Sequence, residues 1–204
     1  MIDFFSFQKT MAHKERPWLV FGKGPSFERH KGYNDLDERF HTISLNHACR
    51  TRPVFIAHMI DANVLDEIPN LEAQAIYVLM PWQPHFNFRA TDKTLEKLVA
   101  EKPVLGTLER MGRLLWYNLV TGPKARAGSP VVKVSYFSAE AVVRLLGMAG
   151  VKKIRTLGVD GGSKYAGSFK DIPPFRGGHT TFDLQNAPIQ QTVKEFGIDY
   201  RPLE

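Results

Sequence analysis

The feature that most constrains this chain is a short apolar run that stops at glycine. Trp18-Leu19-Val20-Phe21 follows Pro17, and Gly22-Lys23-Gly24-Pro25-Ser26 comes directly after it. A continuous apolar run of this length is typical of a strand buried on both faces of a sheet. We therefore expect a first core strand that ends in a glycine-rich loop.

Similar apolar runs alternate with segments of helical spacing along the chain. We expect further strands at Thr42–Leu45, Val54–Ala57, Ala75–Met80, Lys153–Leu157 and Ile198–Tyr200. Helices are expected at Ala62–Glu67, Thr94–Glu101, Ser138–Leu146 and Asn186–Phe196. Strands separated by helices favour a mainly parallel sheet with right-handed crossovers. The predicted fold is therefore α/β, a Rossmann-like three-layer arrangement.

Two segments are less regular. Ser26 to Arg39 is polar and is interpreted as a loop, or as a short helix with Ser26 as its N-cap. Pro103–Pro130 shows no clear pattern apart from the apolar residues around Leu114–Tyr117.

The chain has 204 residues, of which 43% are hydrophobic. That length supports one hydrophobic core, so residues 1–204 are predicted to form a single nucleotide-binding α/β domain. Residues 163–178 are polar, aromatic and rich in glycine and proline. This segment follows the penultimate strand and is predicted to be a lid loop.

Charge and composition limit the classes of partner that the sequence favours. The net charge of +6 favours a phosphate-bearing partner, but no basic stripe interleaved with aromatics is present, so nucleic acid is not expected. The single cysteine, Cys49, fits a reducing compartment. No run of eighteen apolar residues and no signal-peptide pattern is present, which predicts a cytoplasmic protein. The basic surface and the aromatic loop Trp82–Phe88 are compatible with peripheral contact with the inner face of the membrane. A homo-oligomer is also compatible with the sequence.

Three loops are expected to converge beyond the strand ends, namely Gly22–Ser26, the turn at Asn46, and Gly158–Gly162. The glycines of the first loop let backbone approach a ligand, and its N–H groups suit phosphate. The loop matches neither the Walker nor the dinucleotide pattern, and a tight strand-to-helix turn is the competing interpretation.

Three polar side chains are candidates for chemistry, each with a plainer alternative. Asn46 and Asp160 suit ribose or base contacts, but both residue types are common in turns. His179 suits a general base near neutral pH, although a lone surface histidine is the commoner case. His58 and Asp61 lie three apart and would share a site only on a helix. No zinc-site spacing and no nucleophile elbow is present.

Taken in order, these motifs resemble bacterial sialyltransferases that use a CMP-activated donor and a metal-independent variant of the GT-A fold. The broader relatives are the MptE-like Rossmann proteins, which include archaeal pterin pyrophosphokinases. The matching features are Gly22-Lys23-Gly24-Pro25-Ser26 after a strand, Asn46, Ser138 opening a helix, Gly158-Val159-Asp160, the lid residue Tyr165, and His179 before the last helix. They cover residues 17–61 and 135–202.

The resemblance implies an inverting transfer in which His179 is the general base. Tyr165 would stabilise the departing phosphate, assisted by Lys23 or Lys164. Nucleotide binding would fall to Gly22, Lys23, Gly24, Pro25, Ser26, Asn46, Ser138 and Asp160. The partners would be a CMP-sugar donor and a glycan acceptor, as in lipopolysaccharide biosynthesis. No cofactor and no metal are expected, because protein donors can manage the charge of a monophosphate.

Three positions depart from the family pattern. Lys23 replaces an asparagine that contacts the nucleotide, Ala139 replaces a glycine, and Gly162 stands where the family has a first lid tyrosine. Two other functions therefore stay open. One is an ATP- and magnesium-dependent pyrophosphokinase with Asp61 or Asp160 as metal ligands. The other is a non-catalytic nucleotide-binding protein of polysaccharide biosynthesis.

Overall fold

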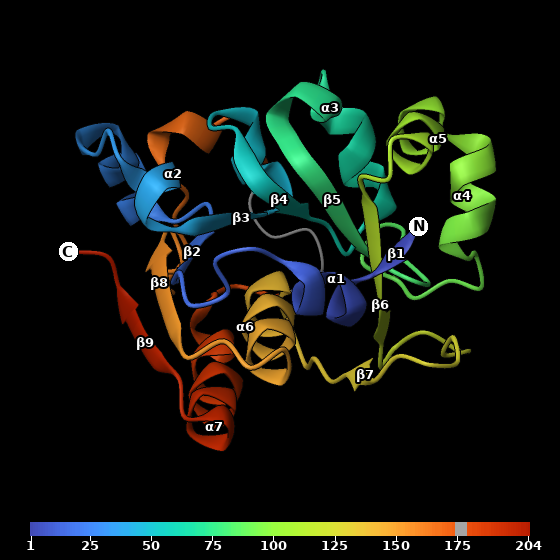
Figure 1. Cartoon of the computed structure of the whole chain (residues 1–204). Coiled ribbons are helices and arrows are strands. Elements are labelled where there is room, and N and C mark those ends of the chain that lie inside the picture. Colours follow the sequence, from blue (N-terminus) through green and yellow to red (C-terminus); the bar gives the residue numbers. More distant parts are fainter. Residues whose placement is uncertain (174–178) are drawn as a thin grey trace.

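A parallel sheet forms the centre of the molecule (Figure 1). The computed structural model describes residues 1–173 and 179–204. Within them, the strand order is β1-β6-β5-β4-β3-β2-β8-β9, and β7 pairs with β6; every pairing is parallel. The strands are β1 Ile2–Asp3, β2 Trp18–Phe21, β3 His41–Leu45, β4 Val54–His58, β5 Ala75–Pro81, β6 Leu114–Leu119, β7 Val131–Val132, β8 Lys153–Leu157 and β9 Asp199–Pro202.

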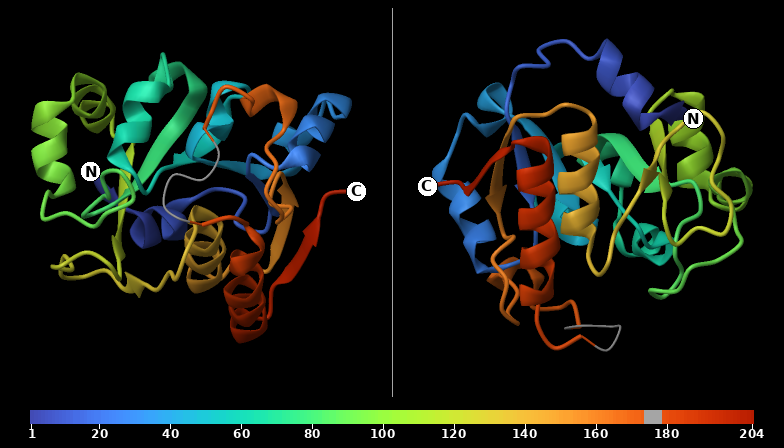
Figure 2. Two further views of the ribbon diagram at one scale, coloured as in Figure 1. Left: turned by 180° about the vertical axis from the view of Figure 1, so that it is seen from behind. Right: turned by 90° about the horizontal axis from the view of Figure 1, so that it is seen from below.

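Helices cover both faces of the sheet. The α-helices are α1 Phe4–Thr10, α2 Leu36–Arg39, α3 Leu71–Gln74, α4 Leu95–Glu101, α5 Pro103–Arg110, α6 Ser138–Met148 and α7 Asn186–Phe196. Short 3-10 helices are η1 Pro25–Gly32, η2 Asn46–Arg50, η3 Ala62–Glu67, η4 Gly167–Phe169 and η5 Asp183–Gln185. Helices α1, α6 and α7 pack on one face, and α2 to α5 pack on the other (Figures 1 and 2). The predicted three-layer α/β fold is confirmed.

The first core strand shows why the sheet is buried on both sides. Leu19 and Phe21 belong to the core under α2 to α5, whereas Trp18 and Val20 belong to the core under α1 and α6. Successive side chains of a strand point to opposite faces, so an unbroken apolar run fills both layers at once.

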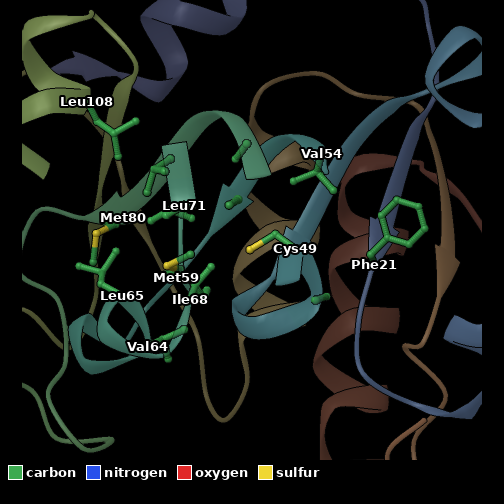
Figure 3. Close-up of a cluster of buried hydrophobic side chains, with 14 of the residues drawn as sticks. Phe21, Cys49, Val54, Met59, Val64, Leu65, Ile68, Leu71, Met80 and Leu108 are labelled. Carbon is green, nitrogen blue, oxygen red and sulfur yellow. The ribbon is translucent and has the colours of Figure 1, made fainter. Parts of the chain in front are cut away.

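Figure 3 shows part of the core on the α2-to-α5 side, where aliphatic side chains pack together with Cys49 and Met59. Burial raises the pKa of the Cys49 thiol to about 11. A thiol with that pKa stays protonated near neutral pH, so Cys49 serves as a small apolar side chain.

The chain reverses direction across the sheet at β2. It runs outward from β2 through β3, β4, β5 and β6, and then returns to place β8 on the opposite side of β2. Such a reversal leaves a crevice beyond the carboxyl ends of the strands, which is the usual place for a ligand in open α/β sheets.

Sequence patterns did not predict the structure of two parts of the chain. The segment Pro103–Pro130 contains α5 and β6, and β6 is fully buried between β1 and β5. The N-terminal residues form α1, whose Phe4 and Phe7 pack into the core. None of the described helices combines the length and the hydrophobicity that a membrane span requires.

One local prediction is wrong. Ser26 is not the N-cap of a helix, because η1 begins at Pro25 and Gly24 occupies the capping position. The Ser26 hydroxyl is engaged instead by the loop that follows β8, as described next.

Candidate functional site

A cavity of about 390 Å³ opens at the carboxyl edge of the sheet. It lies between the loops that follow β2, β3, β4, β5, β6 and β8, with the first turn of α6 beside it. The residues proposed from sequence that line it are Gly22, Lys23, Gly24, Asn46, Ser138, Asp160, Tyr165 and His179. Pro25 and Ser26 do not line it. The three strand-end loops therefore converge on one cavity.

Backbone hydrogen bonds join the glycine loop to the end of β8. The amide of Gly22 donates to the Leu157 carbonyl at 2.8 Å, and the amide of Gly24 donates to the Gly158 carbonyl at 2.8 Å. A Cβ on Gly22 would lie 2.1 Å from the Gly158 oxygen, and one on Gly24 would lie 2.6 Å from Oδ2 of Asp160. These two glycines are needed because the two loops pass too close for a side chain.

Asp160 completes this contact. Its Oδ2 accepts the Ser26 amide at 2.7 Å, and its Oδ1 accepts the Ser26 hydroxyl in a short hydrogen bond. The Ser26 Oγ in turn accepts the amide of Gly158 at 2.7 Å. We call these bonds and the glycine contacts the β2–β8 clasp.

The clasp corrects one expectation. The N–H groups of Gly22, Gly24 and Ser26 were expected to bind phosphate, but each donates to an acceptor within the protein. Their structural role is to shape one wall of the cavity. Asp160 still lines the cavity while it holds Ser26.

Asn46 and Ser138 meet on the same wall. Asn46 Nδ2 donates to Ser138 Oγ at 3.3 Å, and the Asn46 backbone has a φ of 50°. Asn46 Oδ1 is buried and has no hydrogen-bond partner among the residues that the structure describes. A buried unpaired acceptor is costly, so this oxygen is suited to receive a hydrogen bond from a ligand.

Glu140 fixes the turn that leads into α6. Its buried carboxylate accepts the amides of Ser135, Tyr136 and Phe137 at 2.8, 3.2 and 3.1 Å. Burial raises the pKa of Glu140, and these three hydrogen bonds oppose that rise. These hydrogen bonds hold the turn that places Ser138 at the cavity. The N-terminus of α6 favours an anion there.

Aromatic rings surround His179. Its ring centroid lies 5.2 Å from that of Phe137 and 5.8 Å from that of Tyr136. Phe182 packs between Phe137 and Tyr165, at 5.3 and 5.6 Å. The two residues expected to be catalytic, His179 and Tyr165, therefore reach the cavity from one aromatic cluster.

The loop after β8 is fastened to the segment that carries His179. Gly162 donates its amide to Asp183 Oδ1 at 2.8 Å, and its carbonyl accepts the Phe182 amide at 2.7 Å. Gly162 has a φ of 64°, a conformation that favours glycine. A tyrosine at this position would be strained here.

The predicted lid, residues 163–178, is only partly described. Phe169 is fully buried and packs on Phe27 at a centroid distance of 4.8 Å. The Ala166 amide donates to the Lys23 carbonyl at 2.7 Å, and Lys23 Nζ lies 4.6 Å from the centre of the Tyr165 ring. The first part of the segment thus packs on the body of the protein, while residues 174–178 lie outside the described residues.

A further part of the cavity wall holds polar residues that the nucleotide-site motifs did not include; among them, Asp61 was named only as a metal ligand for the pyrophosphokinase alternative. His47 Nε2 lies 2.9 Å from Glu67 Oε2, and His85 Nε2 lies 2.7 Å from Thr121 Oγ1. Burial lowers the pKa of both histidines; the charge of Lys23 lowers that of His47 further. Asp61 is 5% exposed, and burial raises its pKa.

The signal for this wall was present but weak. His47, Asp61 and His85 each follow a strand within a few residues, as Asn46 does. His58 does not share their site. It lies in β4, its Nε2 is 2.9 Å from the Tyr117 hydroxyl, and complete burial lowers its pKa to about 3.

Across the described residues, no group of three or more histidine, cysteine, aspartate or glutamate side chains is arranged to hold a metal ion. No protein-family model, no curated protein and no solved structure matches this chain. The function is therefore inferred from the cavity and its residues.

The clasp makes a stability prediction. Gly22→Ala should lower the free energy of unfolding by about 2 kcal/mol or more, because the added Cβ meets the Gly158 carbonyl. Gly32→Ala is the control, since nothing lies within 4 Å of its Cβ. That variant should stay within about 0.5 kcal/mol of wild type, or be slightly stabilised. Urea unfolding measures both, and equal stabilities would contradict the clasp.

Proposed function

We propose that this protein transfers a sugar from a CMP-activated donor to a hydroxyl group of a glycan acceptor, with His179 as general base. One observation carries the proposal. Asn46, Ser138, Asp160, Tyr165 and His179 come from separate parts of the chain and line a single cavity. Their order along the sequence is the order found in the CMP-dependent sialyltransferases that the chain resembles.

The size and position of the cavity agree with this proposal. Its volume of about 390 Å³ falls within the range of about 300–1,000 Å³ that is typical of small-molecule sites. It lies at the carboxyl ends of the strands beside the β2 reversal point. Nucleotides bind at this position in open α/β sheets.

The nucleotide would occupy the wall formed by the clasp and by α6. Asn46 Oδ1 would accept a hydrogen bond from the ligand, and Ser138 at the start of α6 would meet its phosphate. Lys23, whose ammonium group lies over the Tyr165 ring, adds a positive charge next to the same wall.

The transfer step then follows from the residues around His179. The imidazole takes the proton of the acceptor hydroxyl as its oxygen forms a bond to the anomeric carbon of the donor. The bond from that carbon to the phosphate oxygen breaks, and its electron pair leaves with CMP. Tyr165 and Lys23 stabilise the negative charge that develops on the departing phosphate.

A second function has one observation in its favour. Asp61 and Asp160 both line the cavity, and carboxylate oxygens are ligands that Mg²⁺ prefers. An ATP-dependent pyrophosphokinase of the MptE-like type would use them to hold magnesium and the triphosphate.

A thermal-shift panel separates the two functions. CMP, CDP, UDP, GDP, ADP and ATP are each added with and without magnesium. A ligand present at 100 times its Kd stabilises the folded state by about 2.7 kcal/mol. We expect CMP to raise the Tm equally in both conditions. A rise with ATP and magnesium alone would favour the pyrophosphokinase and contradict the proposal.

His179→Ala tests the general base. Transfer from CMP-activated sugar should fall by at least about 100-fold, because positioned proton transfer contributes about 10²–10⁴ to rate. The shift in Tm caused by CMP should stay unchanged. Thr180→Ala, an exposed neighbour that does not line the cavity, is the control and should keep wild-type transfer. Wild-type turnover by His179→Ala would rule out this assignment.

A further inference from the structure

A strained turn holds an exposed phenylalanine at the cavity. The amides of Phe86 and Arg89 each donate to the carbonyl of the other at 3.0 Å. The two residues between them have positive φ, 48° at Asn87 and 64° at Phe88. This is the φ pattern of a type I′ turn, whose second central position is usually glycine. A phenylalanine there is a backbone outlier.

Two side chains from the loop after β4 hold this turn in place. The Phe88 amide donates to Asp61 Oδ1 at 2.8 Å, and the Asn87 amide donates to Asn63 Oδ1 at 3.1 Å. The Phe88 residue is nevertheless 47% exposed, and it lines the cavity. Neither the backbone conformation nor packing in the core explains why a phenylalanine occupies this position. Trp82, at the other end of the same aromatic loop, is buried against Trp116.

Asp61 brings a polar group to the same place. The residue is 5% exposed and lines the cavity, and its Oδ1 is used by Phe88. The Phe88 amide bonds to Oδ1, and the second carboxylate oxygen, Oδ2, belongs to the same cavity-lining side chain. An oxygen of a desolvated carboxylate is a strong acceptor when a ligand supplies the donor.

We propose that Phe88 and Asp61 form the acceptor subsite of this cavity and bind a pyranose glycoside. The sugar would lay its apolar C–H face on the Phe88 ring and donate a hydroxyl hydrogen bond to Asp61 Oδ2. The inference rests on the proposed function, because it assigns the acceptor of that transfer to this cavity.

The chemistry of a pyranose matches this pair of residues. One face of the ring carries C–H groups that suit the negative face of an aromatic ring, and the rim carries hydroxyl donors. An exposed ring beside a carboxylate meets both needs. The strain at Phe88 fits the same role, since residues held in sparsely populated backbone conformations cluster at binding sites.

The test uses saturation-transfer NMR with three probes, namely the methyl β-glycosides of galactose, glucose and N-acetylglucosamine, with CMP present. Phe88→Gly removes the ring but suits the left-handed backbone, so its Tm should equal or exceed that of wild type. Saturation transfer to the best probe should fall at least five-fold. Phe88→Tyr, which keeps an aromatic face, should retain most of the signal.

Asn70→Gly is the matched control. Asn70 also has a positive φ, 52°, and it does not line the cavity. This variant receives the same relief of backbone strain and should bind the glycoside as wild type does.

The outcomes separate this inference from the proposed function. Equal saturation transfer in wild type and Phe88→Gly would overturn the subsite, as would absence of transfer to all three probes from the wild-type protein. The Tm shift with CMP is measured in parallel. If CMP fails to bind while the glycoside binds through Phe88, the proposed function is wrong and the subsite stands.

Discussion

The clasp between the loops after β2 and β8 is the contact on which the rest of the site depends. Two strands that are neighbours in the sheet, but more than a hundred residues apart in the chain, end in loops that share backbone hydrogen bonds at Gly22 and Gly24. Asp160 and Ser26 lock the same loops through side chains. Because β2 is also the point where the strand order reverses, the clasp closes one wall of the crevice that the topology opens. The close contact between the two loops therefore explains why glycines are needed at these positions. The strand order explains why a cavity lies beside them.

Local patterns were sufficient to predict much of the fold. The strand Trp18–Phe21 and the helix Asn186–Phe196 were placed within their observed bounds, because buried strands and amphipathic helices leave regular patterns of apolar residues. Strand β6 was not identified, although it is fully buried between β1 and β5. It follows Gly112 and Arg113 and contains Asn118, whose side chain bonds to the carbonyls of Arg126 and Ser129. Only the tertiary structure shows that this polar side chain is satisfied inside the sheet.

The sequence predicted one part of the cavity wall better than the other. The clasp wall was proposed from a series of short motifs in order, and the structure brings those residues together even though the donor groups of the glycine loop are used internally. The part of the wall with His47, Asp61 and His85 was reached only through Asp61, as a metal ligand for the alternative function. Asp61 and His85 look like ordinary residues of turns until the strand order places β4 and β5 side by side. Phe88 gave no sequence signal, because its positive φ belongs to a turn whose amide donates to Asp61, a residue 27 positions earlier in the chain.

We propose that one cavity, bounded on one side by the clasp, binds a cytidine nucleotide without metal. Titration of CMP into the ¹⁵N-labelled protein in the presence of EDTA tests it most directly. We expect saturable shifts of backbone amide signals around Gly24, Asn46, Ser138 and Asp160, with little change at Arg16 and Glu72 near the opposite ends of the strands. Signals that stay unshifted at millimolar CMP, or that shift only at that opposite edge, would contradict it.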